Sequence, residues 1–376
     1  MKEVKFKELF DYQKKSKIKA GDGLSLSEGK YPFFTSSNTL SKSLNEFLFT
    51  KTSLIFGTGG VPSVHFCEAK FAVSTDCLVA QPKKEVEIFV KYFYYFFIQN
   101  DLRILADGFK GAGLKHISRK YIDEIKIPLP PLTTQKHIAQ ILDDAAALRD
   151  KTQQLLTEYD QLAQSIFLEM FGDPVINPKG WEVFKLDDLT NLITDGKHGN
   201  CNDVDNSGYF FVSAKNIRNN KINFLDSRQI PKSEFEEVDK RTNLQPGDLV
   251  MINTGATIGR MAIAEDIPET RRMTFQKSVA VIKVKKELLS PLFLQYVFKL
   301  RLETFATKGS GTAIKNLLLS EMKRFKIVTP PIHLQNQFAE KIGLIEQQKA
   351  LAKQELQQSE DLFNCLLQKA FKGKLV

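Results

Sequence analysis

The sequence reads PPLTTQ at residues 130–135 and PPIHLQ at residues 330–335. The two copies lie at an offset of 200 residues, and the offset holds without a gap as far as Phe171 and Phe371. Identical residues recur in register along this stretch, including Gln135/Gln335, Ala139/Ala339, Gln154/Gln354, Leu156/Leu356 and Leu162/Leu362. A long internal repeat of this kind determines the architecture, so both copies are expected to form the same structure.

Each copy is predicted to form one long helix. The Pro-Pro pair blocks a helix before it and favours a helix start at its second proline. Apolar residues then recur at steps of three and four, as in a heptad seam. The predicted seam residues are Ile138, Ile141, Ala145, Leu148, Leu155, Tyr159, Leu162 and Ile166 in the first copy, and Phe338, Ile342, Ile345, Ala352, Leu356, Phe363 and Leu366 in the second. Thr152, Lys349 and Ser359 interrupt these series.

From Gln135 to Met170 such a helix spans about 54 Å, which suits a rod. Two amphipathic rods in one chain are expected to pack on each other as an antiparallel coiled coil, because a whole domain lies between them. The alternative is that each helix packs on its own neighbouring domain. The chain is therefore divided into a globular domain at residues 1–128, a helical spacer at 129–173, a second globular domain at 174–328 and a C-terminal helical spacer at 329–376.

The two globular domains repeat each other loosely. YFFVSAKN at residues 209–216 is similar to YPFFTSSN at 31–38, and the strand that runs into Gly255 is similar to the strand before Gly57. Both domains then carry an aromatic-rich stretch that predicts a helix, at residues 87–106 and 287–307. The predicted fold class is α/β (α+β), with short strands in each globule. The rods agree more closely than the globules, as expected if the globules differ in specificity.

Length and composition limit the classes of protein. At 376 residues the chain has room for two to three domains, and its 42% hydrophobic and 26% charged content is typical of globular proteins. The formal net charge of +9, with a pI near 9.1, favours a polyanionic partner such as nucleic acid.

The cysteines and the amino-terminal sequence indicate the cellular compartment to be expected for the protein. The cysteines at positions 67, 77, 201 and 365 form no CxxC pair, so we expect buried reduced thiols in a cytoplasmic protein. No apolar leader follows Met1, and the apolar run at 89–98 is shorter than a membrane span requires. Neither a signal peptide nor a membrane segment is expected.

No catalytic constellation is evident. LPPL at residues 129–132 and TPPI at 329–332 are similar to the Asn/Asp-Pro-Pro-aromatic loop of amino-methylating DNA methyltransferases, but they lack the Asn or Asp and the aromatic residue. The glycine turns at 57–60 and 309–311 do not continue as phosphate-binding loops, although backbone N–H groups beside a phosphate stay a secondary alternative. The five histidines are scattered, so no metal site is expected.

Polar and basic residues cluster at the predicted strand ends of both globules. Arg and Lys contact phosphates or guanine edges, Asn bonds adenine, and Ser or Thr bonds either base. Each cluster alone is typical of a solvated loop, but together, on two repeated globules of a basic chain, they favour DNA. The candidate DNA-binding residues are Ser36, Ser37, Asn38, Thr58, Lys110, Lys115, His116, Lys197, His198, Lys215, Asn216, Arg218, Thr254, Arg260, Lys308 and Lys315.

The chain resembles, over essentially its full length, the DNA-specificity subunits of type I restriction–modification systems. The Pro-Pro-Leu/Ile-x-x-Gln motif before each long helix carries the resemblance, with Trp181–Leu189 at the opening of the second domain and the turn Gly255–Gly259. The first domain departs from the pattern, because Lys2–Val4 has no Trp and Gly57–Gly60 replaces the turn. The resemblance implies two target-recognition domains that each read one half of a split site in double-stranded DNA, with the coiled coil setting the unread spacer.

The resemblance also implies partners. Two methyltransferase (modification) subunits, which would bind S-adenosylmethionine, and restriction (translocase/nuclease) subunits would assemble on this chain. The chain itself would be no enzyme and would hold no cofactor. Two alternatives stay open, a coiled-coil protein-interaction scaffold and an atypical DNA methyltransferase. S-adenosylmethionine bound to the isolated chain would favour the methyltransferase, and a failure to bind duplex DNA would favour the scaffold.

Overall fold

The computed structural model describes residues 2–307 and 316–375, with the backbone alone for residues 303–307. The chain forms two compact units, Met1–Leu155 with Ala352–Val376, and Leu156–Leu351. Each unit contains one globule and about half of each long helix. This division falls inside the helices, whereas the predicted boundaries at residues 128, 173 and 328 separate globules from helices and stay a prediction.

The first unit is built on an antiparallel sheet of order β2-β9-β6-β7. A second sheet, β3-β5-β4-β8, is mixed because β4 pairs with β8 in parallel. Strand β1 pairs with β12, so the two ends of the globule meet. Its elements are β1 (Glu3–Lys5), α1 (Phe6–Leu9), β2 (Phe10–Tyr12), η1 (Ala20–Asp22), β3 (Leu24–Ser25), β4 (Tyr31–Phe34), β5 (Lys42–Leu44), β6 (Ser53–Gly57), β7 (Ser63–Cys67), β8 (Ala72–Val73), β9 (Cys77–Pro82), α2 (Val90–Ala106), β10 (Phe109–Lys110), β11 (His116–Ile117), α3 (Arg119–Asp123) and β12 (Lys126–Pro128).

The second unit repeats this plan. Its antiparallel sheet has the order β14-β22-β19-β20, strand β15 pairs in parallel with β21, and β13 pairs with β23. Helix α5 is an addition to the plan of the first unit. The elements are β13 (Val183–Lys185), η2 (Leu186–Leu189), β14 (Thr190–Asp195), β15 (Phe210–Val212), η3 (Ala214–Asn216), β16 (Ile217–Arg218), β17 (Lys221–Ile222), β18 (Arg228–Gln229), α5 (Lys232–Thr242), β19 (Leu249–Ile252), β20 (Met261–Ile263), η4 (Pro268–Arg272), β21 (Met273–Phe275), β22 (Val279–Val284), α6 (Pro291–Thr307), α7 (Leu319–Lys323) and β23 (Lys326–Val328). The loose repeat of the globules, and the α/β class, are therefore confirmed.

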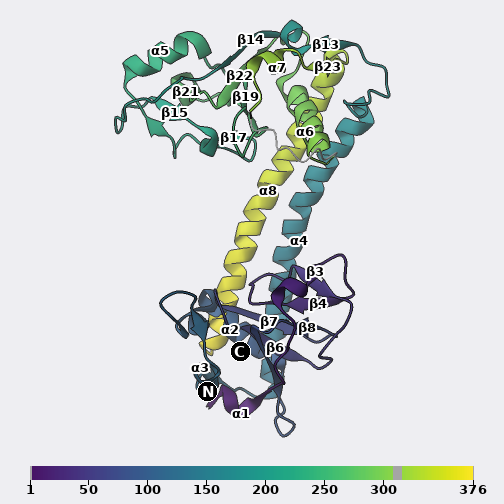
Figure 1. The fold of residues 1–376 in the computed structure, drawn as a ribbon, viewed down its shortest axis with the longest axis vertical. Helices are drawn as coiled ribbons and strands as arrows, with labels where there is room; N and C mark the ends of the chain where they lie inside the picture. Colours follow the sequence, from purple (N-terminus) through teal and green to yellow (C-terminus); the bar gives the residue numbers. More distant parts are fainter. Residues whose placement is uncertain (1, 308–315, 376) are drawn as a thin grey trace. The chain divides into compact units, whose positions relative to one another are not determined.

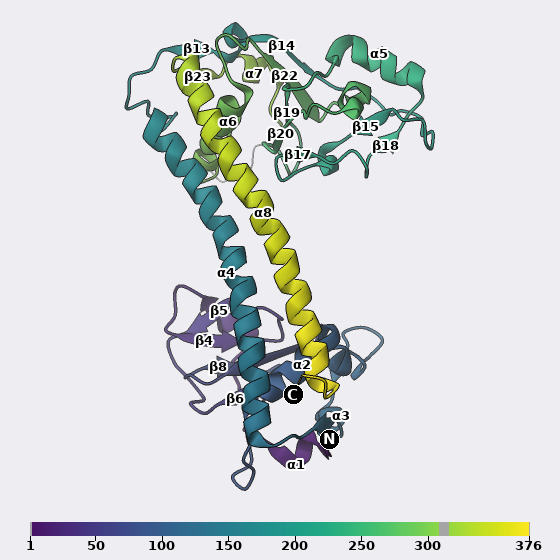
Figure 2. The ribbon, with the colours of Figure 1, turned by 180° about the vertical axis from the view of Figure 1, so that it is seen from behind.

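The two long helices are confirmed as well. Helices α4 (Leu132–Phe171) and α8 (Ile332–Phe371) each have 40 residues and begin directly after the Pro-Pro pairs. Within each unit they run side by side (Figures 1 and 2). The start of one helix meets the end of the other, as in an antiparallel coiled coil. The shared core residues are Ile138, Leu142, Ala145, Phe363, Leu367 and Ala370 in the first unit, and Ala163, Phe167, Phe171, Phe338, Ile342 and Ile345 in the second.

The seam differs in detail from the prediction. Leu148 is 50% exposed and Leu162 is 47% exposed, whereas Leu142, outside the predicted series, is fully buried. A helix with 3.6 residues per turn drifts from a strict 3.5-residue repeat, so the buried face changes along its length. The polar interruptions Thr152 and Ser359 are buried, and their hydroxyls donate to the carbonyls four residues earlier.

The aromatic helices α2 and α6 pack on the sheets and on the long helices α4 and α8. In the first unit Phe97 packs on Phe6 and Phe56 at ring distances of 5.7 and 5.0 Å. The helix predicted at 87–106 begins later, at Val90, and is interrupted at Gln99–Leu102. Asn100, Asp101 and Leu102 there have φ of 49°, 53° and 61°. Non-glycine residues rarely adopt this conformation, so the interruption is strained.

Candidate nucleic-acid interface

The glutamine of each Pro-Pro motif joins a long helix to its globule. Gln135 is 1% exposed, and its side-chain oxygen accepts a 2.9 Å hydrogen bond from the backbone N–H of Phe89, just before α2. The side-chain oxygen of Gln335 accepts a 2.8 Å bond from the N–H of Ser290, just before α6. The amide nitrogens donate to the carbonyls of Pro130 and Pro330, and that of Gln335 also to Leu288. Buried polar groups of this kind fix the direction of each globule on its own helix.

Four candidate residues of the first unit come together at the turn after β6, and we call them the first-unit turn cluster: Ser36, Thr58, Lys115 and His116. The hydroxyls of Ser36 and Thr58 both donate to the carbonyl of Asp76, at 2.8 and 2.9 Å. Nδ1 of His116 donates to the carbonyl of Thr58 at 3.2 Å. The carbonyl of Lys115 accepts from the N–H of Gly60. The side chains of Lys115 and His116 are exposed, so this cluster is a fixed surface that carries free polar groups.

The other first-unit candidates border this cluster. Lys110 stands opposite His116 in the β10–β11 pair and is exposed. The backbone carbonyl of Ser37 accepts a 2.8 Å hydrogen bond from Nε2 of His65. Burial lowers the pKa of His65, so its ring is neutral and holds the loop rather than contacting phosphate. Asn38 follows in the chain and is exposed.

The second unit repeats the cluster at the turn after β19. The hydroxyl of Thr254 donates to the side-chain oxygen of Asn316 at 2.9 Å, and the two residues form a β-bridge. Asn316 lies 200 residues after His116, whose own bridge partner is Gly59 in the first turn. The glycine turns of the two globules are therefore equivalent, even though their sequences differ. Asn316 was not among the residues predicted from sequence, but its register with His116 is a signal that identifies it.

The loop after β14 offers less free charge than its sequence indicates. The ammonium of Lys197 lies 3.3 Å from Glu237 and 3.6 Å from Glu234, and both distances are those of ion pairs. His198 lies 3.2 Å from Asp195. Lys197 therefore holds α5 against this loop through its ion pairs, and its charge is less available for a contact with DNA. Burial raises the pKa of the neighbouring Cys201 thiol to about 12, so this cysteine stays protonated. Cys67, Cys77 and Cys201 are buried as expected, but Cys365 on α8 is exposed, contrary to the prediction.

Of the three candidates after β15, Asn216 has a structural role. It is 1% exposed, its side-chain oxygen accepts from the N–H and hydroxyl of Ser213, and its nitrogen donates to the carbonyl of Asn223. All these bonds lie within the protein, so this side chain is closed to a base and we withdraw it as a candidate. Lys215 and Arg218 are exposed. Two further candidates, Lys308 and Lys315, lie outside the described residues.

Arg218 and Arg260, predicted from separate motifs, line one pocket of about 380 Å³ together with Lys299. We call it the basic pocket. Asn219 and Asn220, with φ of 52° and 60°, form the two-residue turn between β16 and β17 that presents Arg218. Lys299 was not predicted as a DNA-binding residue, because a lysine within a core helix is expected on its solvated face. The one sequence signal for it is that it is a basic residue among the apolar residues of α6, where it is exposed.

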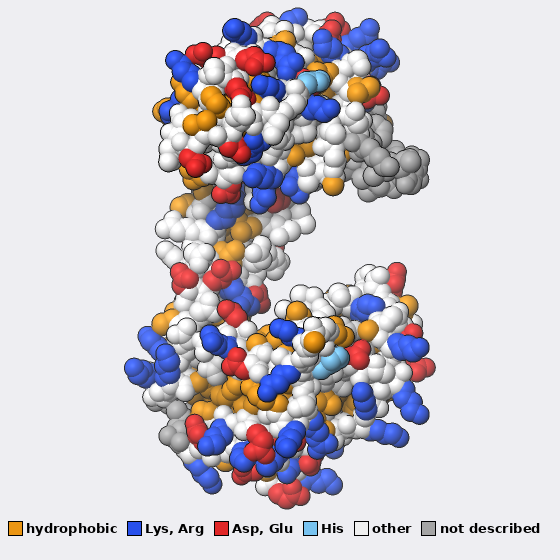
Figure 3. All heavy atoms as spheres, turned by 60° about the vertical axis from the view of Figure 1, so that its left-hand side comes forward, with side chains coloured by type: hydrophobic (Ala, Val, Ile, Leu, Met, Phe, Trp, Pro, Cys, Tyr) orange, Lys and Arg blue, Asp and Glu red, His pale blue; other side chains and the backbone are white. Residues whose placement is uncertain are grey.

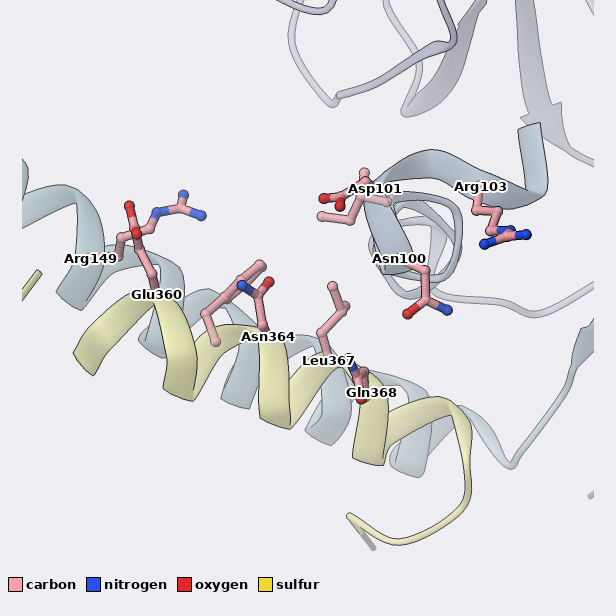
Figure 4. Close-up of a pocket in the computed structure, with 10 residues that line it drawn as sticks. Asn100, Asp101, Arg103, Arg149, Glu360, Asn364, Leu367 and Gln368 are labelled. Atoms are coloured by element: carbon pink, nitrogen blue, oxygen red, sulfur yellow. The ribbon is translucent and has the colours of Figure 1, made fainter. Parts of the chain in front are cut away.

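The first unit has a pocket of about 940 Å³ that is lined by α2, α4 and α8. Figure 4 shows Asn100, Asp101 and Arg103 of the interrupted α2 on one side, and Arg149 of α4 with Glu360 of α8 on the other. The Arg149 guanidinium lies 5.0 Å from the centre of the Phe363 ring. Acidic and basic side chains alternate here, so this pocket lacks the positive charge of the basic pocket.

The described part of the chain shows neither a metal site nor a membrane-spanning helix. No group of three or more His, Cys, Asp or Glu side chains there is placed to hold a metal ion. None of the helices described is long and apolar enough to cross a bilayer. Figure 3 shows Lys and Arg side chains spread over this face of each unit, mixed with fewer Asp and Glu.

The chain is similar in sequence and in fold to known proteins. The chain is 23% identical to the type I restriction enzyme MjaVIII specificity subunit of Methanocaldococcus jannaschii, over 93% of this chain and 87% of that one. It is 24% identical to the type I restriction enzyme EcoBI specificity subunit of Escherichia coli, over 76% of this chain and 66% of that one. The fold is similar to the crystal structure of a type I restriction–modification S subunit from M. genitalium, with a TM-score of 0.58 and 18% identity over 98% of this chain and 96% of that chain.

The family described as type I restriction modification DNA specificity domain matches twice, at residues 1–158 and 178–360. The two matches cover both globules and most of both long helices, in agreement with the repeated architecture. This chain therefore belongs to the type I restriction modification DNA specificity family and carries two copies of its domain.

Proposed function

We propose that this chain is the DNA-reading subunit of a type I restriction–modification complex, and that each globule reads one half of a split site. The observation that carries the proposal is the repeated turn. In each unit a residue at the same repeat position, His116 or Asn316, is fixed on the turn after an equivalent strand. Two equivalent surfaces with different side chains suit two half-sites of different sequence.

The long helices set the unread spacer and dock two modification subunits, and restriction subunits join the same complex. The exposed leucines of α4 and α8 support docking, because apolar side chains on an otherwise solvated helix mark a contact surface. They are Leu148, Leu162, Leu168, Leu344, Leu351 and Leu362. Leu162 and Leu362 occupy the same repeat position and are 47% and 46% exposed, which supports two equivalent docking sites.

S-adenosylmethionine belongs to the modification subunits in this proposal, and the complex acts in the cytoplasm. The chain contributes recognition and no chemistry. Calorimetry of the isolated chain with S-adenosylmethionine distinguishes this from an atypical methyltransferase, for which binding at micromolar concentration is expected.

Exchange of the second globule tests the proposal. Residues 181–324 are replaced by the matching block of another family member, and the methylated sequence of a host that carries the hybrid and its modification subunits is determined. One half of the recognised sequence should change, while the other half and the spacer length should stay as they were. A change in both halves, or in the spacer, would contradict independent reading by two globules on a rigid spacer.

A further inference from the structure

We propose that the basic pocket of the second unit, formed by Arg218, Arg260 and Lys299, binds the sugar–phosphate backbone of DNA beside the half-site. This inference rests on the proposed function and adds where the second globule holds DNA without reading its sequence. The three cations come from separate elements, the β16–β17 turn, the glycine turn before β20, and α6. Each is exposed, and none forms an ion pair with another residue of the described ranges.

The charge of the pocket stays positive despite two carboxylates in its wall. Asp160 and Glu346 line the pocket, but both accept a 2.7 Å hydrogen bond from the buried ammonium of Lys349. Their charges are therefore partly neutralised within the long helices. Arg218, Arg260 and Lys299 are left to attract an anion, and Arg and Lys bind phosphate strongly.

A buried donor in the same wall lacks an acceptor. Gln295 is 7% exposed, and its side-chain nitrogen forms no hydrogen bond within the described structure. A buried donor of this kind costs stability unless a ligand or water supplies an acceptor. Burial raises the pKa of the adjacent Tyr296 to about 12, so its hydroxyl stays protonated and adds a further donor. The pocket thus combines cations with donors, as a site for phosphate oxygens requires.

The size and position of the pocket favour a polymer backbone. At about 380 Å³ it lies within the usual range of ligand sites. Arg218, at the end of β16, and Arg260, directly after the glycine turn that follows β19, both line the pocket. Arg260 is the first basic residue after Thr254 in the chain, so the pocket lies next to the glycine turn.

The test is the salt dependence of binding by the assembled complex of specificity and modification subunits. Dissociation constants for the cognate duplex are measured between about 50 and 200 mM salt, for the wild-type chain and for Arg218→Ala, Arg260→Ala and Lys299→Ala. Removal of one phosphate-binding cation should reduce the slope of log K against log salt by about 0.9. Affinity should fall alike for cognate and unrelated duplexes, and the methylated sequence should stay unchanged.

Lys221→Ala is the matched control, because Lys221 lies on the same hairpin but pairs with Glu265 at 3.0 Å. Its slope should equal that of the wild-type chain. Unchanged slopes for the three pocket variants would overturn the phosphate site, as would a changed methylated sequence, which would identify a base reader. Loss of modification subunits from the variant complexes would also overturn it, in favour of a protein contact. If the wild-type complex itself failed to bind and methylate a specific sequence, the proposed function would fail instead.

Discussion

The phenol oxygen of Tyr95 donates a 2.5 Å hydrogen bond to Oδ1 of Asp143, which ties α2 to α4 in the first unit. Lys91 donates a 2.8 Å bond to the other oxygen of the same carboxylate. The second unit has Tyr296 and Gly343 at the corresponding positions, because Ser290 there occupies the place of Phe89 beside the glutamine of the long helix. Helix α8 therefore lacks the carboxylate that holds α2 to α4 in the first unit.

The first prediction concerns Asp143→Ala. It leaves the hydroxyl of Tyr95 and the ammonium of Lys91 without their acceptor in a half-buried site, so the free energy of unfolding should fall by about 1.5–3 kcal/mol. Asp144→Ala is the control, because this carboxylate accepts a bond from exposed Gln140 on the next face of the helix. Its effect should stay within about 0.5 kcal/mol. Chemical denaturation measures both, and equal losses would contradict the assignment.

A second prediction concerns Gly343. A Cβ added there meets nothing within 4 Å, so Gly343→Ala should stabilise the chain by about 0.5–1 kcal/mol through helix propensity. Gly343→Asp should in addition supply an acceptor for the hydroxyl of Tyr296, the counterpart of Tyr95. A double-mutant cycle of Gly343→Asp with Tyr296→Phe should then show a coupling of about 1 kcal/mol. A coupling near zero would mean that the two positions do not meet.

The glutamine that fastens α8 to its globule supplies a third prediction. Gln335→Leu removes the partners of Ser290 N–H and of the Leu288 and Pro330 carbonyls in a buried place. The loss of unfolding free energy should reach about 3 kcal/mol, since each unsatisfied group costs about 1–3 kcal/mol. Gln337→Leu, at an exposed position of the same turn, is the control. Thermal unfolding of both variants decides the matter, and a loss under about 1 kcal/mol for Gln335→Leu would be evidence against the fastening role.

The fourth prediction concerns base reading by the turns. His116→Ala and Asn316→Ala remove equivalent side chains in the two units, so each should relax the methylated sequence in one half-site, and in opposite halves. Removal of one good base contact costs about 1–3 kcal/mol of discrimination. Sequencing of methylated positions in hosts with each variant provides the readout. Relaxation of the same half by both variants would refute the equivalence of the turns.

The repeat and the long helices were predictable because their signals are local. Pro131 and Pro331 directly precede the helices, and the apolar steps that follow require only neighbouring residues along one helix. The offset of 200 residues also predicted that the globules share a plan. It was harder to predict which face of each long helix is buried, because the packing of the neighbouring helix decides this. Leu148 and Leu162, predicted in the seam, are exposed.

The site was less predictable because its partners are distant in the chain. Asn216 has the residue type of a base reader, but Ser213 and Asn223 use all of its side chain, and only the fold shows this. Lys299 lies in the basic pocket because a hairpin far earlier in the chain packs beside α6. The interruption of α2 at Asn100–Leu102 has no Gly or Pro to announce it, and its strain is visible only in the backbone angles.

The paired strands at the ends of each globule have a consequence for how such chains evolve. Val4 faces Ile127 in the first globule, and Phe184 faces Ile327 in the second, so the first and last strands of each globule lie side by side. Genetic recombination within the helix-coding flanks can therefore replace a whole globule while every helix keeps its register. Under the proposed function, such an exchange would give a host population new combinations of half-sites without point mutations in a recognition surface.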